Sequence, residues 1–224
     1  MITVHHLENS RSQRVLWLLE ELGVEYEIEH HKRDPVTRLA PAELQKLHPL
    51  GKSPIVTDDD VTIAESGAII EYLVGKYDNG RLRPAKGTSE RLSYTYWMHY
   101  AEGTFAPLML LQLILSRIEN APVPFFLKPV TRGIAAKVRD GYLGPNISRN
   151  LAFIESTLGE SRWFCGDSMN AADIQMSFAV DAAEVRADMS SLPNIAAFLA
   201  RMRARPAYQR ALDKGGPYAL LPMN

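Results

Sequence analysis

Residues 48–73 read HPLGKSPIVTDDDVTIAESGAIIEYL, and this stretch predicts two strands followed by a helix. The segments 54–57 and 61–64 are rich in β-branched residues and flank three consecutive aspartates, which is typical of a hairpin. After Ser66 the apolar residues recur at helical spacing, namely Ile69, Ile70, Leu73, Val74 and Tyr77.

The residues before this stretch predict a strand, a helix and a second strand. Residues 2–6 alternate between apolar and polar side chains. The segment 9–27, NSRSQRVLWLLEELGVEYE, shows apolar residues at helical spacing up to Gly23 and a strand-like alternation from Tyr26. With a short helix expected at 42–47, the order becomes βαβ-α-ββα.

The second part of the chain has a different pattern. Residues 79–88 contain several glycine and proline residues and no periodic apolar pattern, so we predict a linker there. Only helices are expected after it, with Pro107 ending or kinking one and Gly144-Pro145 separating two others. The sequence thus predicts an α/β domain over residues 1–78 and an all-helical domain over residues 89–224.

Composition excludes several classes of protein. The chain has 224 residues, of which 46% are hydrophobic and 23% charged, as is usual for a soluble globular protein. A net charge of −1 argues against a dedicated nucleic-acid binder. The single cysteine, Cys165, excludes a disulfide framework or a CxxC redox pair within one chain. If thiol chemistry occurs, the reacting sulfur therefore belongs to a ligand.

The remaining expectations concern location and metals. The sequence shows neither a secretory signal nor an apolar run of membrane-spanning length, so we expect a cytoplasmic protein with no membrane partner. His5-His6 and His30-His31 are adjacent pairs, and neighbouring residues on a strand point to opposite faces. We therefore expect no bound metal.

Polar residues lie where the first strand passes into the first helix. Asn9, Ser10 and Ser12 precede or open the helix, where unpaired backbone N–H groups and the helix dipole favour negative charge. Such a site can stabilise a thiolate. The alternative is purely structural, because Ser10 and Gln13 have the spacing of a capping box.

Two further polar segments flank the predicted hairpin. Lys52 and Ser53 precede Pro54, and a cis Ser53–Pro54 bond would turn the Ser53 N–H and C=O outward as a pair that can hold an extended peptide. Glu65 and Ser66, at the start of the following helix, would suit a ligand with both an ammonium and a carboxylate group. The alternative for Ser66 is a helix N-cap.

Taken together, segments 9–27 and 48–73 resemble the N-terminal domain of cytosolic glutathione transferases. The linker and the helical remainder resemble the second domain of that family, so the resemblance covers essentially the whole chain. GDSMNAADI, residues 166–174, is similar to the family's helix-capping signature, with Asn170 where serine or threonine is more usual. The resemblance implies a thioredoxin-like domain followed by an all-α domain, with glutathione as co-substrate and no metal.

The resemblance also implies roles for the residues of the hairpin. The Ser53–Pro54 bond would be cis, and Ser53 would bind the cysteinyl backbone of glutathione. Glu65 and Ser66 match the positions that hold the γ-glutamyl end. Lys52 lies where side chains approach the glycyl end or the peptide backbone.

For the catalytic hydroxyl, the resemblance implies a serine-type or atypical, bacterial-like member. Tyrosine-type members carry their tyrosine near the end of the first strand, where this chain has His6, Leu7 and Glu8. Ser10 is the first choice for the residue that contacts the thiol. Ser12 and Asn9 remain alternatives.

The activity implied is activation of glutathione as a thiolate that attacks a small hydrophobic electrophile. Candidates for the pocket of that electrophile are Tyr96, Tyr100, Phe105 and Met109, with core or dimer packing as the alternative for each. The family further implies a homodimer. Competing functions are a glutathione-dependent isomerase, dehalogenase or peroxidase of the same fold, and a non-enzymatic binding or assembly module.

Overall fold

A four-stranded sheet with flanking helices forms the N-terminal part of the protein. The computed structural model describes residues 1–216 and 218–220. The elements follow the predicted order: β1 (Ile2–Leu7), α1 (Ser12–Leu22), β2 (Tyr26–His31), α2 (Glu43–Leu47), β3 (Ile55–Asp58), β4 (Val61–Ala64) and α3 (Ser66–Tyr77). The sheet has the order β2-β1-β3-β4, with β1 parallel to β2 and antiparallel to β3.

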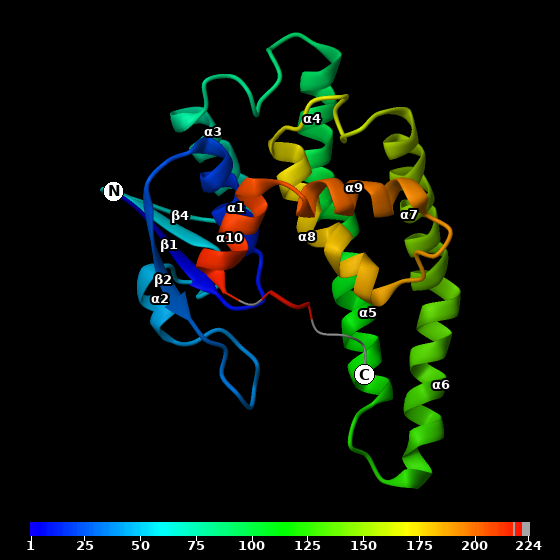
Figure 1. Ribbon diagram of the computed structural model, residues 1–224. Coiled ribbons are helices and arrows are strands. Elements are labelled where there is room, and N and C mark those ends of the chain that lie inside the picture. Colours follow the sequence, from blue (N-terminus) through cyan, green and yellow to red (C-terminus); the bar gives the residue numbers. More distant parts are fainter. Residues whose placement is uncertain (217, 221–224) are drawn as a thin grey trace.

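Helices form the rest of the described chain. They are α4 (Ser89–Tyr100), α5 (Ala106–Glu119), α6 (Lys128–Val138), α7 (Gly144–Glu160), α8 (Ala171–Arg186), α9 (Pro193–Arg203) and α10 (Pro206–Gly215), with a 3₁₀ turn at Phe125–Leu127. Figure 1 shows these helices beside the sheet, with α10 returning to the N-terminal part and packing against α1. Almost every side chain of α8 is buried, which makes this helix the centre of the second domain. None of the helices in residues 1–216 combines the length and apolar character needed to cross a bilayer.

The interruptions predicted at Pro107 and at Gly144-Pro145 take the form of π-helical turns, and the chain stays helical across both. A π-helical turn over Ala101–Phe105 joins α4 to α5, and a second one over Arg139–Leu143 joins α6 to α7. Proline lacks an N–H, and its ring clashes with the carbonyl four residues earlier in an α-helix. At both prolines that earlier residue is a glycine within the wider π turn, so the chain stays helical through the proline.

The capping prediction for α8 is confirmed. The Asn170 side chain accepts a hydrogen bond from the Ala172 N–H at 2.9 Å, and the Asp173 carboxylate accepts one from the Asn170 N–H at 2.8 Å. A second Asp173 oxygen accepts from the Phe164 N–H at 2.8 Å. This reciprocal capping fixes the start of the central helix against the preceding loop.

Candidate active site

Three serine hydroxyls meet where β1 passes into α1. Ser10 Oγ lies 2.8 Å from Ser12 Oγ and 3.3 Å from Ser53 Oγ, although Ser53 is 43 residues away in the sequence. Ser53 in turn donates to the His5 carbonyl at 3.4 Å. Two segments singled out separately in the sequence therefore form one cluster, which we call the serine cluster: Ser10, Ser12 and Ser53.

The predicted capping box of Ser10 and Gln13 does not form, because Arg11 occupies the N-cap position of α1 and makes no side-chain capping bond, although Ser10 contacts the first turn. Ser10 Oγ accepts a hydrogen bond from the Ser12 N–H at 3.2 Å. The Gln13 side chain, which would return the bond, has no partner among residues 1–216 and 218–220. Because Ser10 Oγ is the acceptor in this bond, its own proton can be donated, here to the hydroxyl of Ser12 or Ser53. A bound sulfur could accept that proton in their place.

His6 supports the serine cluster from inside the sheet. Its Nδ1 lies 2.9 Å from Ser12 Oγ, and both residues are buried. Burial, followed by the charge of His30, lowers the pKa of His6 to about 4, so its ring is neutral at physiological pH. A neutral ring can accept the Ser12 proton at Nδ1. The bond fixes the Ser12 hydroxyl, which lies against Ser10.

The hairpin brings Ser53 and Glu65 to the same end of the sheet. Ile55 pairs with both His5 and Ala64. Ser53 lies two residues before Ile55, and Glu65 directly follows Ala64, so both lie beyond this last pair of the hairpin. The Ser53–Pro54 bond is cis, as the resemblance implies. Ser53 precedes the first ladder pair of β3, so its backbone lies outside the ladder.

Glu65 has the backbone geometry of a functional position. Its φ is 72° and its ψ 120°, a region that non-glycine residues rarely adopt. Glu65, and not Ser66, occupies the N-cap position of α3, so Ser66 as the cap is wrong. Ser66 is buried in the first turn of that helix, and Lys52 is exposed.

A cavity of about 280 Å³ lies between the loop around Asn9 and Arg11 and the helices α5 and α8. Of the four pocket candidates, Met109 lines this cavity, and the structure does not place the other three there. Phe105 and Tyr100 are buried in the core, and Tyr96 is half-exposed and stacks on Tyr100. The π turn before α5 changes the helical phase, so the cavity wall follows Ala106, Met109, Leu110, Leu113 and Arg117.

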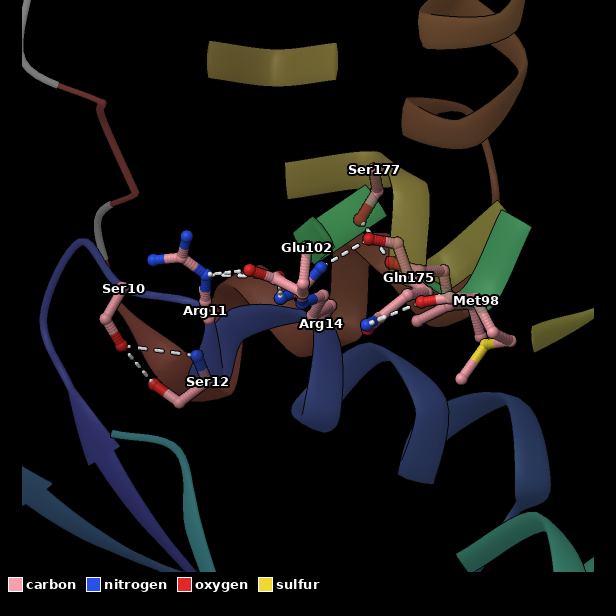
Figure 2. Close-up of polar contacts among 9 residues, drawn as sticks. Ser10, Arg11, Ser12, Arg14, Met98, Glu102, Gln175 and Ser177 are labelled. Atoms are coloured by element: carbon pink, nitrogen blue, oxygen red, sulfur yellow. Dashed lines mark hydrogen bonds and ion pairs between the residues drawn. The ribbon is translucent and has the colours of Figure 1, made fainter. Parts of the chain in front are cut away.

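An ion-pair network joins the two domains beside this cavity. Figure 2 shows Arg11 and Arg14 of the N-terminal domain converging on Glu102, which lies in the first π turn. Arg14 is 2% exposed and also donates to the Gln175 carbonyl of α8. Burial raises the pKa of Glu102, but the charges of Arg14 and Arg11 outweigh burial and hold the pKa below its usual value. Glu102 is therefore an anion between two cations.

Comparison with known proteins gives the family. The model of the glutathione S-transferase N-terminal domain matches residues 1–75, and that of the C-terminal domain matches residues 142–206. The chain is 39% identical over 216 residues to glutathione S-transferase 3 of Schizosaccharomyces pombe, covering 96% of this chain and 88% of the relative. The chain belongs to the glutathione S-transferase family. It is also 31% identical over 223 residues to glutathione S-transferase 1 of Saccharomyces cerevisiae, covering 96% and 95% of the two chains.

A solved glutathione S-transferase confirms the fold. The crystal structure of the protein from Actinobacillus pleuropneumoniae superposes with a TM-score of 0.80 at 30% identity, covering 96% of this chain and 93% of the other. The thioredoxin-like domain with a helical second domain is thus the glutathione S-transferase fold. Membership in the family makes this chain an enzyme with glutathione as co-substrate.

One group of side chains in the described part of this glutathione S-transferase has the geometry to hold a metal. Potential ligand atoms of His5, Glu29 and His31 lie within 4.8 Å of one another. The adjacent histidines do point to opposite faces, but parallel pairing sets His5 opposite Glu29 and Leu7 opposite His31. Sequence reasoning missed this group because it considered each strand alone. The group lies on the face of the sheet opposite to His6, which contacts Ser12, and is therefore separate from the serine cluster.

Sequence reasoning also missed the residues that join the domains. Arg14 lies four residues before Leu18, on the apolar face of α1, and Glu102 falls in a segment with no motif. The only available signal was a charged residue inside an apolar helical face, which indicates a buried partner. The sequence does not identify that partner.

Proposed function

We propose that this transferase holds the thiolate of glutathione at Ser10 and delivers it to an electrophile in the cavity between the Asn9–Arg11 loop and helices α5 and α8. The observation that carries this proposal is the serine cluster, in which Ser10 Oγ lies between the hydroxyls of Ser12 and Ser53. Ser10 is placed at the N-terminus of α1, where backbone N–H groups and the helix dipole favour an anion. A thiolate here would receive the Ser10 proton as a hydrogen bond.

The contacts of Ser12 and Asn9 favour Ser10 over both alternatives. Ser12 is completely buried, and its hydroxyl is engaged by His6 and the Leu7 carbonyl. The Asn9 side-chain oxygen accepts a hydrogen bond from the Ala219 N–H at 2.7 Å, which ties it to the C-terminal segment. We therefore assign Ser10 as the residue that contacts the sulfur, and Ser12 as a positioning residue behind it.

The remaining glutathione contacts follow from the family pattern and the hairpin geometry. We assign the Ser53 backbone to the cysteinyl part of glutathione, Glu65 and Ser66 to its γ-glutamyl end, and Lys52 to its glycyl end. Pro54 is the last residue before β3, which begins at Ile55. The close approach of Ser10 to Ser53 supports this arrangement, because it puts the cysteinyl contact beside the proposed thiol contact.

The proposed reaction is a nucleophilic transfer. The glutathione thiol loses its proton to solvent, and the resulting thiolate remains hydrogen-bonded to Ser10. The sulfur then attacks an electrophilic carbon in the cavity, a C–S bond forms, and the leaving group departs with its electron pair. The protein lowers the thiol pKa and holds the two reactants together.

Isomerisation, dehalogenation and peroxide reduction on the same fold are the alternatives, and an assay of reaction classes separates them. We expect turnover of activated aryl halides with glutathione, and retention of the protein on immobilised glutathione. Activity confined to a hydroperoxide or to an isomerisation substrate would instead favour that alternative. Failure to bind glutathione in any assay would favour a binding or assembly module and contradict the proposal.

We also propose that the protein is a homodimer in the cytoplasm, as its family pattern implies. Light scattering of the purified protein should then give about twice the chain mass of 25.1 kDa. A mass equal to that of one chain at micromolar concentration would contradict the dimer.

A further inference from the structure

Arginines dominate the polar lining of the cavity next to the Asn9–Arg11 loop. Of residues 1–216 and 218–220, five arginines and no aspartate or glutamate line it: Arg11, Arg33, Arg38, Arg117 and Arg186. They come from the β1–α1 loop, the segment after β2, and helices α5 and α8. The whole chain carries a net charge of only −1, so this positive charge is a local feature of the cavity.

Arg186 is a buried member of this group, with one donor atom unpartnered among the described residues. It is 8% exposed, and its Nε is buried with no hydrogen-bond partner in the described chain. One guanidinium nitrogen donates to the Met109 carbonyl at 3.4 Å, and no carboxylate of residues 1–216 or 218–220 lies within ion-pair distance. Burying a charge without a counter-charge is costly, so such residues are rare unless a ligand supplies the partner.

The neighbouring arginines increase the uncompensated charge. Arg33 directs its donors to the backbone carbonyls of Glu8, Asn9 and Arg38, which carry no net charge. Burial lowers the pKa of Arg186; Tyr218 offsets part of this effect, and the charges of Arg11 and Arg117 add to it. Of the five arginines, Arg11 has an ion-pair partner among the described residues, namely Glu102.

Apart from Asn9, the rest of the cavity wall is apolar. Met109, Leu110 and Leu113 of α5 line the cavity. Phe178 of α8 also lines it, and the Arg11 Cζ lies 4.7 Å from the centre of the Phe178 ring. An occupant that matches both parts of the wall has an apolar body and an anionic group.

We infer that the electrophile taken by this enzyme is an apolar molecule bearing a carboxylate or a comparable oxyanion, which binds between Arg186 and Arg117. This inference rests on the proposed function, because it identifies the second substrate of that site. Arg186 and Arg117 belong to the helical domain, whereas the residues assigned to glutathione lie at the end of the sheet. The anion therefore belongs to the second substrate and not to glutathione.

The test compares 4-chloro-3,5-dinitrobenzoate with its uncharged methyl ester. In both, the glutathione sulfur bonds to the ring carbon that carries chlorine, and chloride leaves with the bonding electrons. Each kcat/KM is divided by the rate of the uncatalysed reaction with glutathione, which removes the difference in intrinsic reactivity. We expect the wild-type enzyme to prefer the benzoate.

Two variants test the arginines, and a third serves as the matched control. Arg186→Gln should lower the preference for the benzoate by about tenfold or more, because a buried charge-assisted contact is lost. Arg117 is exposed, so its substitution should not disturb folding, and Arg117→Gln should lower the preference for the benzoate by about two- to fivefold. Arg149→Gln, at an exposed arginine of α7 outside the cavity, should leave it unchanged.

A binding measurement keeps this inference separate from the proposed function. Calorimetry with 3,5-dinitrobenzoate, which has no leaving group, should show binding to the wild-type protein and much weaker binding to Arg186→Gln. If neither chloro compound is turned over while this pattern holds, the proposed function fails and the inference on the anion stands. An unchanged preference and unchanged binding in both cavity variants would overturn the inference, as would an Arg186→Gln effect confined to the KM for glutathione.

Discussion

Replacing Ser10 by alanine is expected to lower kcat/KM for conjugation by about 10- to 100-fold at neutral pH, with glutathione still bound. The reason is the loss of one hydrogen bond to an anion, worth about 1.5–3 kcal/mol, from the thiolate and from the transition state that forms from it. The Ser53 backbone and the γ-glutamyl contacts are untouched, so binding persists. Steady-state kinetics with an activated aryl halide measure the first effect, and calorimetry with glutathione measures the second.

Ser12→Ala is the matched comparison for Ser10→Ala. It removes the hydroxyl between His6 and Ser10 but leaves the Ser10 proton free to reach the sulfur. For Ser12→Ala we expect a loss in kcat/KM of only a few-fold. Full turnover in Ser10→Ala with a severe loss in Ser12→Ala would transfer the catalytic role to Ser12.

The second large effect is on stability. Glu102→Gln should reduce the free energy of unfolding by about 3 kcal/mol, because it leaves the guanidinium of Arg14 buried without its counter-charge. For a chain of this length the melting temperature should fall by about 6–12 °C. Equilibrium unfolding in urea and thermal melting give the two numbers.

Glu184→Gln supplies the control for that prediction. Its ion pair with Arg203 is about 40% exposed on both sides, and such surface pairs contribute at most about 1 kcal/mol. Equal losses in Glu102→Gln and Glu184→Gln would show that the domain contact depends on apolar packing and not on the buried charges.

The order of elements in the first domain was predictable because each element has its own local signal. Alternating residues predict β1, helical spacing predicts α1, and Gly23 ends α1 with a left-handed φ of 69°. The capping of α8 by Asn170 and Asp173 was predictable for the same reason. The proline at 107 signals an interruption of the helix, but the form of that interruption was not predictable, because a π turn has no clear sequence signal.

The site was predictable only in part, because its assembly depends on contacts between distant segments. The candidates Ser10 and Ser53 each follow from a local motif, but their 3.3 Å approach depends on the pairing of β1 with β3. The cavity is less accessible to sequence reasoning. Its arginines come from four separate segments, and a surface arginine and Arg186 look alike in a sequence.

The pKa of the bound glutathione thiol tests the central claim most directly. Titration of the thiolate absorbance in the complex should give a pKa below 7 in the wild-type protein, against ~8.5 for a free thiol. In Ser10→Ala the pKa should rise by about one to two pH units, since each unit corresponds to about 1.4 kcal/mol. The same thiol pKa in both proteins, with glutathione bound to each, would contradict the assignment of Ser10.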